Sequence, residues 1–293
     1  MNETKCTTCS DKDTRRCNTG QCTGSPVLPQ NDASDIKQVI AVMSGKGGVG
    51  KSSVSALLAI ALARRGYKVG ILDADITGPS IPKLFGLVDR PEQFKNYILP
   101  VKTSLGIQVM SLNLFLPQED DPVIWRGPIL SSAVKQFWTD VAWGKLDYLI
   151  VDMPPGTGDV PLTVMQSLPL NGLVVVSSPQ DLAMMVVSKT IKMARQACIP
   201  ILGLVENMSY IACPHCGEKI QPFGNGSVKE AASKKGLTLL AVLPVDPELA
   251  KLADAGRIED YEETSLRNIE PLVEVVEKGY NRKVEGCENC HHQ

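Results

Sequence analysis

The segment from Gly45 to Ser52 restricts the fold of this chain more than any other part of it. Its sequence, GKGGVGKS, matches the phosphate-binding pattern G-x-x-x-x-G-K-[ST]. The apolar run Val39–Met43 before it predicts a buried strand, and the stretch from Lys51 to Arg65 after it predicts a helix. Strand, glycine-rich loop and helix in this order are the context that the pattern requires. The chain is therefore expected to form an open α/β sheet with a phosphate site at a strand end.

The residue types in this loop suit a nucleoside triphosphate, ATP in particular. Glycines let backbone N–H groups approach the phosphates, and Lys51 is expected to bind the β and γ phosphates. The Ser52 hydroxyl is suited to coordinate Mg²⁺. A glycine-rich turn without a ligand is the alternative, which the agreement of every fixed position disfavours. The residues expected to bind the nucleotide are Gly45, Gly47, Gly48, Val49, Gly50, Lys51, Ser52 and Ser53.

Strand-like and helix-like segments then alternate along the chain, which predicts a mostly parallel sheet with helices on both faces. The apolar runs are 69–72, 107–112, 148–151, 173–176, 201–205 and 239–243. The helical segments are 129–142, 159–168, 181–196, 227–235 and a last one, 265–279, expected at the sheet edge. We expect three parts: a cysteine-rich N-terminal segment over 1–35, one P-loop ATPase domain over 36–280, and a cysteine/histidine tail over 281–293.

Polar residues at the predicted strand ends are candidates for catalysis and for binding the base. Asp75 and Asp152 follow two strands, where a carboxylate can orient water or contact the Mg²⁺ shell. Asn207 follows a third strand, and its amide suits an adenine edge. Pro244 and Asp246 follow the last strand and are expected to border the base. Isolated Asp, Asn and Pro residues also occur in ordinary turns and caps.

The nine cysteines are clustered, which in a reducing compartment favours metal binding over disulfides. Cys213 and Cys216 form a CxxC pair, whereas Cys198 stands alone in a predicted helix as a small buried side chain. Four thiols near the start could hold one iron–sulfur cluster or one zinc ion. These are Cys6, Cys9, Cys17 and Cys22, and the tail adds Cys287, Cys290, His291 and His292.

Charge and hydropathy argue against two classes of partner. The net charge of −2 provides no basic surface for nucleic acid or for an anionic membrane. The longest apolar stretch, Leu57–Ala63, is too short to span a bilayer, and no signal-peptide pattern opens the sequence. We expect a cytoplasmic protein that binds neither nucleic acid nor membrane.

The second lysine of the loop, Lys46, makes GKGGVGKSS similar to the deviant Walker A loop of the MinD, ParA, ArsA and nitrogenase iron-protein superfamily. This resemblance implies that Lys46 reaches across a homodimer to the partner's nucleotide. It also implies catalytic roles for Lys46, Lys51, Asp75 and Asp152, with Asp75 assigned to hydrolysis.

Five further segments in order resemble the Mrp/ApbC family of iron–sulfur carrier ATPases, over roughly residues 36 to 280. They are DITGPSIP from Asp75, WRGP from Trp125, DMPPGTGD from Asp152, NMS from Asn207 and CPHCG from Cys213. The resemblance implies an ATPase that holds a [4Fe–4S] cluster at its dimer interface and transfers it to apo-proteins. The chain departs from some relatives in the spacing of its N-terminal cysteines and at Thr77, where they often have cysteine.

Three alternatives remain. The first is a zinc-stabilised nucleotide-binding adaptor, because CPxCG also has the shape of a zinc knuckle. A MinD- or ParA-like positioning ATPase is disfavoured by the polar tail after Gly279, since the MinD type needs an amphipathic membrane helix. An electron-transfer protein like the nitrogenase iron protein is disfavoured because its cluster cysteines lie far apart in the chain. The tail fits the C-x-x-C-H haem pattern, which is set aside because haem attachment needs export. Cluster donor, recipients and a heteromeric partner in place of one subunit stay open.

Overall fold

The structure is a computed structural model that describes residues 27–75, 80–115, 127–179, 181–223, 230, 232–233, 236–262 and 264–279. The four N-terminal cysteines, Thr77, Trp125 and Arg126 lie outside the described residues. So do the tail with its two cysteines and two histidines, and most of the helix expected over 227–235.

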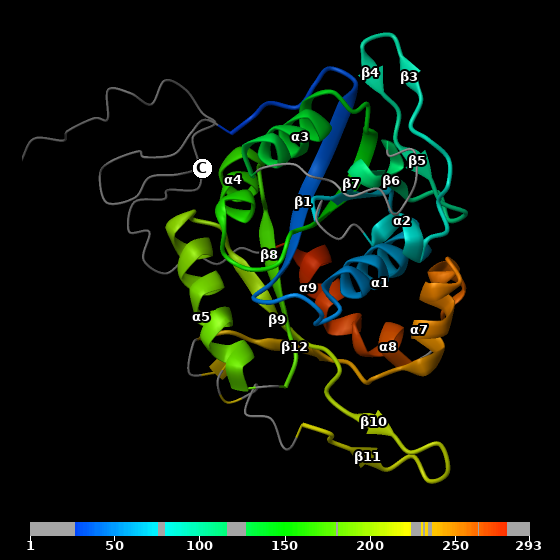
Figure 1. Cartoon of the computed structure of the whole chain (residues 1–293), viewed down its shortest axis with the longest axis vertical. Helices are drawn as coiled ribbons and strands as arrows, with labels where there is room; N and C mark the ends of the chain where they lie inside the picture. The colour runs from blue at the N-terminus through cyan, green and yellow to red at the C-terminus, as the bar shows by residue number, and fades with distance from the viewer. Residues whose placement is uncertain are drawn as a thin grey trace, which may run out of the picture.

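One eight-stranded sheet forms the centre of the molecule, with the strand order β12-β9-β8-β1-β7-β2-β6-β5 (Figure 1). Neighbouring strands run parallel except β5, which is antiparallel to β6. The predicted fold class is thereby confirmed. The strands are β1 Ser34–Ser44, β2 Val69–Asp73, β5 Val101–Lys102, β6 Gln108–Ser111, β7 Gly144–Asp152, β8 Gly172–Ser177, β9 Ile201–Glu206 and β12 Leu239–Val242.

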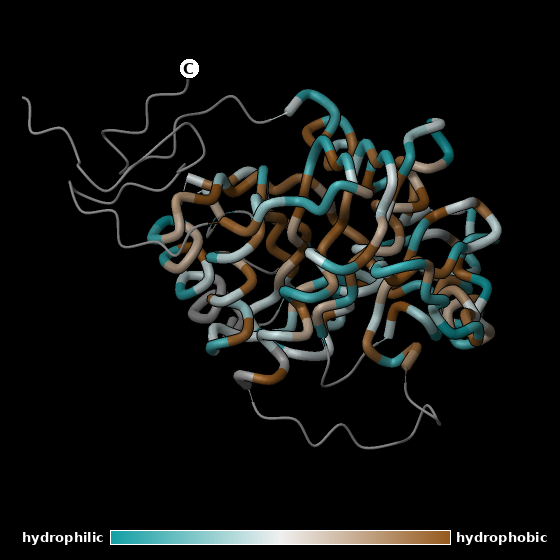
Figure 2. The backbone as a smooth tube through the Cα atoms, turned by 90° about the horizontal axis from the view of Figure 1, so that it is seen from above, coloured by the Kyte–Doolittle hydropathy of each residue, from teal (hydrophilic) through white to brown (hydrophobic). Residues whose placement is uncertain are grey.

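Helices cover both faces of the sheet. Side chains along each strand point alternately to the two faces, and on both faces they are apolar and need a covering layer. On β1, Val39, Ala41 and Met43 belong to one core, while Ile40 and Val42 belong to the other. Figure 2 shows the apolar segments running through the middle of the molecule and polar ones at the loops. The first core packs against α3 Gly127–Thr139, α4 Asp159–Ser167 and α5 Asp181–Gln196. The second packs against α1 Lys51–Arg64, α2 Ile81–Leu84, α7 Pro247–Asp254, α8 Thr264–Asn268 and α9 Glu270–Lys278.

The last helical segment is two helices where the sequence predicted one. Pro271 lies in the first turn of α9, where its missing N–H costs no intrahelical hydrogen bond. A continuous helix through this position would lack that bond, so the chain ends α8 at Asn268 and starts again. The α9 helix packs beside α1 and covers β12, a strand at one edge of the sheet, and its neighbour β9.

Short elements that have no periodic pattern were not predicted. Two hairpins stand outside the main sheet: β3 Gln93–Phe94 with β4 Tyr97–Ile98, and β10 Ile211–Ala212 with β11 Lys219–Ile220. The 3-10 turns η1 Leu112–Phe115 and η2 Ile258–Asp260 complete the described elements. Packing also begins earlier than Val39, since the Leu28 N–H donates to the Ser167 carbonyl and the Leu28 carbonyl accepts from Trp138 Nε1. Within the described part of the chain, no helix has the length and hydropathy needed to cross a bilayer.

Candidate functional site

The phosphate loop, Gly45–Gly50, joins β1 directly to the N-terminus of α1. Gly48 and Gly50 have φ values of +77° and +75°, a backbone region that favours glycine. The loop turns sharply there, and α1 begins at Lys51 with its N-terminal N–H groups facing the loop. The strands on either side, β8 and β7, end at the same edge of the sheet. The predicted strand–loop–helix unit is therefore present.

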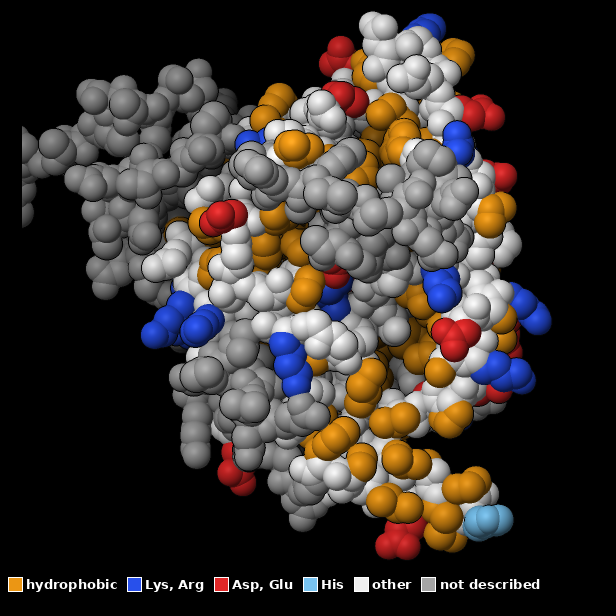
Figure 3. Space-filling view, in the orientation of Figure 1, with side chains coloured by type: hydrophobic (Ala, Val, Ile, Leu, Met, Phe, Trp, Pro, Cys, Tyr) orange, Lys and Arg blue, Asp and Glu red, His pale blue; other side chains and the backbone are white. Residues whose placement is uncertain are grey.

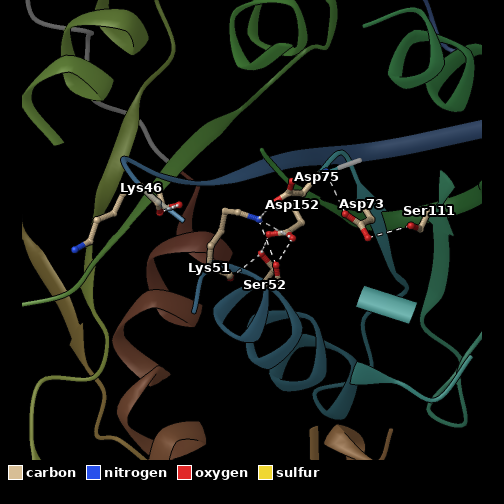
Figure 4. A network of polar contacts seen from close by, with 9 residues as sticks. Lys46, Lys51, Ser52, Asp73, Asp75, Ser111 and Asp152 are labelled. Carbon is tan, nitrogen blue, oxygen red and sulfur yellow. Dashed lines mark hydrogen bonds and ion pairs between the residues drawn. The ribbon is translucent and has the colours of Figure 1, made fainter. Parts of the chain in front are cut away.

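Lys51 lies at the centre of a buried polar cluster at this edge. Its Nζ is 2.8 Å from Asp152 Oδ2 and 3.4 Å from Asp75 Oδ2, so the structure brings these three predicted residues together (Figure 4). Burial alone would lower the pKa of Lys51, but the negative charges of Asp152 and Asp75 outweigh it and raise the pKa. Lys51 is therefore held as a cation in a site where anionic ligands would meet it.

Asp152 is the last residue of β7 and is completely buried. Its Oδ2 accepts from Ser52 Oγ at 2.6 Å, and its Oδ1 accepts from Ser55 Oγ at 2.7 Å. A serine hydroxyl beside a carboxylate is a donor set that Mg²⁺ prefers. Ser52 and Asp152 therefore fit the predicted magnesium position.

A third carboxylate, Asp73, is the last residue of β2 and lies deeper than Asp75. Asp73 Oδ2 accepts from Ser111 Oγ at 3.0 Å, and Asp73 Oδ1 accepts from the Asp75 N–H at 3.1 Å. Burial first, and then the nearby charge of Asp152, raise the pKa of Asp73 well above its ordinary value. The contact of Asp73 with the Asp75 backbone makes it a support for the predicted hydrolytic residue.

Lys46 points away from the cluster formed by Lys51 and Asp152, although it belongs to the same loop (Figure 4). The carbonyl of Lys46 accepts from Ser44 Oγ at 2.9 Å, which fixes the start of the loop. The Lys46 side chain therefore takes a direction different from that of Lys51.

The three residues predicted to contact adenine have different surroundings. Asn207 is buried, and its Nδ2 donates to the Val49 carbonyl at 3.0 Å. Asp246 Oδ1 caps α7 by accepting from the N–H groups of Glu248 and Leu249. Its Oδ2 accepts from the Tyr261 hydroxyl, and burial together with this carboxylate raises the pKa of Tyr261 to about 12.

Pro244 is buried at the end of the β12 segment, close to this cap. Asn207 thus lies beside the phosphate loop, whereas both carboxylate oxygens of Asp246 are engaged in holding α7.

The CxxC pair lies on the β10–β11 hairpin, which extends from the body of the protein. Cys213 is half-buried and Cys216 is exposed. The turn is closed by the Gly217 N–H, which donates to the Cys213 carbonyl at 2.8 Å. N–H groups of Cys216 and His215 donate to the Cys213 sulfur and lower its pKa. A thiol held in this way is closer to the thiolate form that binds iron or zinc.

Apolar side chains gather over this hairpin and the strand-end loop beside it (Figure 3). They are Ile211, Ile220, Phe223 and Val245, all more than a third exposed. In the part of the chain that the structure describes, no group of three or more Cys, His, Asp and Glu side chains could hold a metal. The two thiols therefore need further ligands from elsewhere to complete a metal site.

Two site residues were not found from the sequence. Ser55 binds both the Lys51 carbonyl and Asp152, and its position four residues after Lys51 on one helix face could have indicated it. Ser111 binds Asp73 from β6, a strand far away in the sequence. No local pattern signals that contact, because it depends on which strands are neighbours.

Comparison with known proteins gives consistent matches along most of the chain. A profile of the ParA family, described as NUBPL iron-transfer P-loop NTPase, matches residues 35–278. Proteins named iron-sulfur cluster carrier protein are 46% identical in Clostridium perfringens and 44% identical in Methanocaldococcus jannaschii. The first alignment covers 87% of this chain and 94% of the relative, and the second covers 86% and 88%.

Solved structures resemble the same region. A nucleotide-binding protein from Archaeoglobus fulgidus, in complex with ADP, is 49% identical with a TM-score of 0.71 and covers 79% of this chain and 91% of its own. The cell division ATPase MinD of Pyrococcus furiosus has a TM-score of 0.57 at 22% identity, covering 82% and 98%. At that identity the likeness concerns the fold alone.

Proposed function

This chain belongs to the ParA family of NUBPL iron-transfer P-loop NTPases, and we propose on that basis that it is an ATP-dependent iron–sulfur cluster carrier. It would bind a [4Fe–4S] cluster between two copies of the chain and pass it to apo-proteins. The curated relatives named iron-sulfur cluster carrier protein support this role. The cluster is cargo, and ATP is the substrate of the reaction that controls it.

The observation that carries the proposal is the CxxC pair on the β10–β11 hairpin, with Cys213 half-buried and Cys216 exposed. A [4Fe–4S] cluster is usually held by four thiolates, and the hairpin offers two. A two-fold axis would place the same two thiols of a second copy opposite the first pair. Exposure of Cys216 suits a cluster that must be released to another protein. The apolar residues around the hairpin would be covered in such a dimer.

The nucleotide site supplies the residues for hydrolysis. Lys51 would exchange its carboxylate partners for the β and γ phosphates, since its charge is already fixed in the site. Ser52 and Asp152 would hold Mg²⁺ and its water shell, and the ion would neutralise phosphate charge. Asp75 would then orient the attacking water. Asn207 and the segment at Pro244–Asp246 would border the adenine.

ATP turnover is expected to be slow, because its role is to switch the relation between the two subunits. Lys46 would contact the nucleotide of the partner subunit, so ATP would favour one dimer arrangement and its hydrolysis another. The cluster would be protected in one arrangement and accessible in the other. The N-terminal segment over 1–35 would form a separate metal-binding part.

Anaerobic reconstitution followed by iron, sulfide and zinc analysis tests the proposal. The wild-type chain is compared with a variant carrying Cys213→Ser and Cys216→Ser, and with Cys198→Ser as the matched control. We expect the double variant to lose the iron and sulfide of one shared cluster, which is half a cluster per chain. Cys198→Ser should keep the wild-type content. Equal iron in the double variant and the wild type would refute the cluster assignment.

A second preparation lacking residues 1–26, which keeps the contacts of Leu28 with the domain, separates the hairpin from the N-terminal cysteines. Iron and sulfide that remain in this truncated chain, and disappear with Cys213→Ser and Cys216→Ser, belong to the hairpin. Zinc in place of iron at the hairpin would instead support the adaptor alternative.

A further inference from the structure

The base of the cysteine hairpin is tied to the phosphate loop through the side chain of Asn207. Its Nδ2 donates to the Val49 carbonyl at 3.0 Å, between residues 158 positions apart in the sequence. The exposed fractions of Asn207 and Val49 are only 8% and 2%, so water does not compete freely for this bond. A Cβ atom at position 50 would lie 2.2 Å from Asn207 Nδ2. Gly50 is therefore required for the contact as well as for its positive φ.

This hydrogen bond fixes the orientation of a loop peptide. The peptide between Val49 and Gly50 is planar and trans, so its carbonyl and its N–H point in opposite directions. When Asn207 holds the Val49 carbonyl, the Gly50 N–H is directed to the other side of the loop. Loops with this pattern bind phosphates through such N–H groups. By holding the Val49 carbonyl on one side of the loop, Asn207 thus orients the Gly50 N–H toward the side where phosphate would bind.

The same residue begins the segment that leads to the cysteines. Asn207 is anchored by its own N–H to the Ser177 carbonyl, and Met208 follows with φ +58°, a strained conformation for a methionine. The Ser209 N–H then donates to the Leu243 carbonyl, and the Tyr210 carbonyl accepts from the Val245 N–H. Strand β10 starts at the next residue and ends just before Cys213.

We propose that Asn207 is a positioning residue that couples nucleotide binding at the phosphate loop to the conformation of the cysteine hairpin. A phosphate bound by the Gly50 N–H and the Asn207 amide bound to the Val49 carbonyl hold the same peptide plane, so each contact stabilises the other. Because segment 207–210 is anchored by hydrogen bonds and leads directly into β10, a fixed Asn207 also restricts the conformation of the hairpin base. Coupling of this kind is reciprocal, so the state of the hairpin also changes nucleotide affinity. The biological purpose of this coupling rests on the proposed function, whereas the contacts of Asn207 do not depend on it.

Hydrogen exchange of the full-length, metal-free chain with and without ADP tests the coupling. We expect saturating ADP to slow exchange of the amides from Met208 to Cys213 about fivefold or more in the wild type. Asn207→Ala should lose most of this slowing and bind ADP more weakly. The matched control is Asn268→Ala. Asn268 Nδ2 donates to the Tyr210 hydroxyl and the Val242 carbonyl at the hairpin base, and neither partner belongs to the phosphate loop. This control should keep the response to ADP.

An unchanged ADP response in Asn207→Ala would overturn the inference, as would a wild type without any response. If Asn207→Ala binds no measurable ADP, Asn207→Leu keeps a side chain of similar size and shape and removes the donor without adding a charge beside the phosphate loop. If that variant also fails to bind, exchange at 208–213 must already be faster than in the ADP-free wild type, and equal rates overturn the coupling. Iron content of the same proteins after anaerobic reconstitution keeps the tests apart. A wild type that holds the hairpin cluster without an ADP response refutes this inference alone, whereas absent hairpin iron refutes the proposed function.

Discussion

Lys51 is bound by two carboxylates in a position where its positive charge is strongly favoured. The Lys51 ammonium and Asp152 are 6% and 0% exposed in their side chains, so each depends on the other for charge balance. Asp152 also keeps hydrogen bonds from Ser52 and Ser55, which limits the damage when the lysine is removed. If Lys51 is removed, the buried Asp152 carboxylate therefore still has its two serine partners.

Replacing Lys51 by alanine is expected to reduce ATP hydrolysis about 10²- to 10³-fold, the range for loss of one group that stabilises a developing negative charge. Phosphate release and ATP binding measure the effect, and thermal unfolding checks the fold. Lys37→Ala is the control, because Lys37 lies at the opposite end of β1 and pairs with Asp147. Wild-type turnover in Lys51→Ala would contradict the catalytic role.

Asp73 provides a prediction about pH. Its pKa is raised in the folded protein, so the folded state holds the proton more tightly than the unfolded chain does. The stability from this proton is fully present below the unfolded pKa of about 4 and is lost as pH rises through the folded pKa. Asp73→Asn mimics the protonated form and can still accept from the Asp75 N–H.

The Asp73→Asn variant should therefore gain stability relative to the wild type at pH 8, and gain little at pH 4. The Tm at pH 8 minus the Tm at pH 4 should be larger in the variant than in the wild type by about 3 °C or more, which corresponds to roughly 1 kcal/mol in a domain of this size class. Parallel Tm curves for the two proteins would show that Asp73 is not protonated in the fold. ATP turnover across the same pH range separates this stability effect from support of Asp75.

At the scale of elements, the turn of the cysteine hairpin depends on one glycine. Gly217 has φ +75° and no atom within 4 Å of the Cβ that alanine would add, so a substitution meets conformational strain without a clash. Gly217→Ala should open the turn that brings N–H groups to the Cys213 sulfur. The pKa of Cys213 would then rise, and its alkylation at neutral pH would slow.

Iodoacetamide labelling followed by peptide mass spectrometry measures the pKa of the Cys213 thiol in both proteins. Gly106→Ala is the matched control, since Gly106 has φ +81°, equal space around it and a place far from the hairpin in another turn. If Gly217→Ala leaves the labelling curve of Cys213 unchanged, the turn does not activate this thiol.

The elements that the sequence predicted well are those with a long pattern of their own. The strand–loop–helix unit around Gly45–Ser52 and the helix at 181–196 could be placed because periodicity and fixed residues agree. Two-residue strands such as β10 have no period to detect, although the CxxC pair between β10 and β11 was visible. The contacts Ser111–Asp73 and Asn207–Val49 join distant segments and follow from strand order, which one sequence does not encode locally.

At the scale of the whole molecule, the nucleotide site and the cysteine hairpin lie at the same edge of the sheet, the one formed by the carboxyl ends of its parallel strands. The phosphate loop leaves β1, and the hairpin leaves β9, with only β8 between these two strands. A second copy that approaches this edge would therefore meet both Lys46 and the hairpin. The domain division proposed for 1–35, 36–280 and 281–293 leaves this edge entirely within the central part.

Lys46 provides the test of the dimer, because it points away from the Lys51 cluster of its own chain (Figure 4). We expect a nonhydrolysable ATP analogue to convert the wild type from monomer to dimer mass in light scattering. Lys46→Ala should still bind the analogue at its own loop but dimerise about tenfold or more weakly, a loss of roughly 1.4 kcal/mol. Equal dimerisation of the two proteins would refute the cross-subunit contact.

One two-fold axis must satisfy both the nucleotide contact and the shared cluster, and this links the two ligands. If both are bound across the same interface, each favours the dimer that the other needs, so cluster-loaded protein should dimerise at lower concentrations of the ATP analogue than metal-free protein. A chain with Cys213→Ser and Cys216→Ser should dimerise with the analogue alone and show no shift after reconstitution. The same curve for loaded and metal-free wild type would mean that the cysteines and Lys46 do not share one interface.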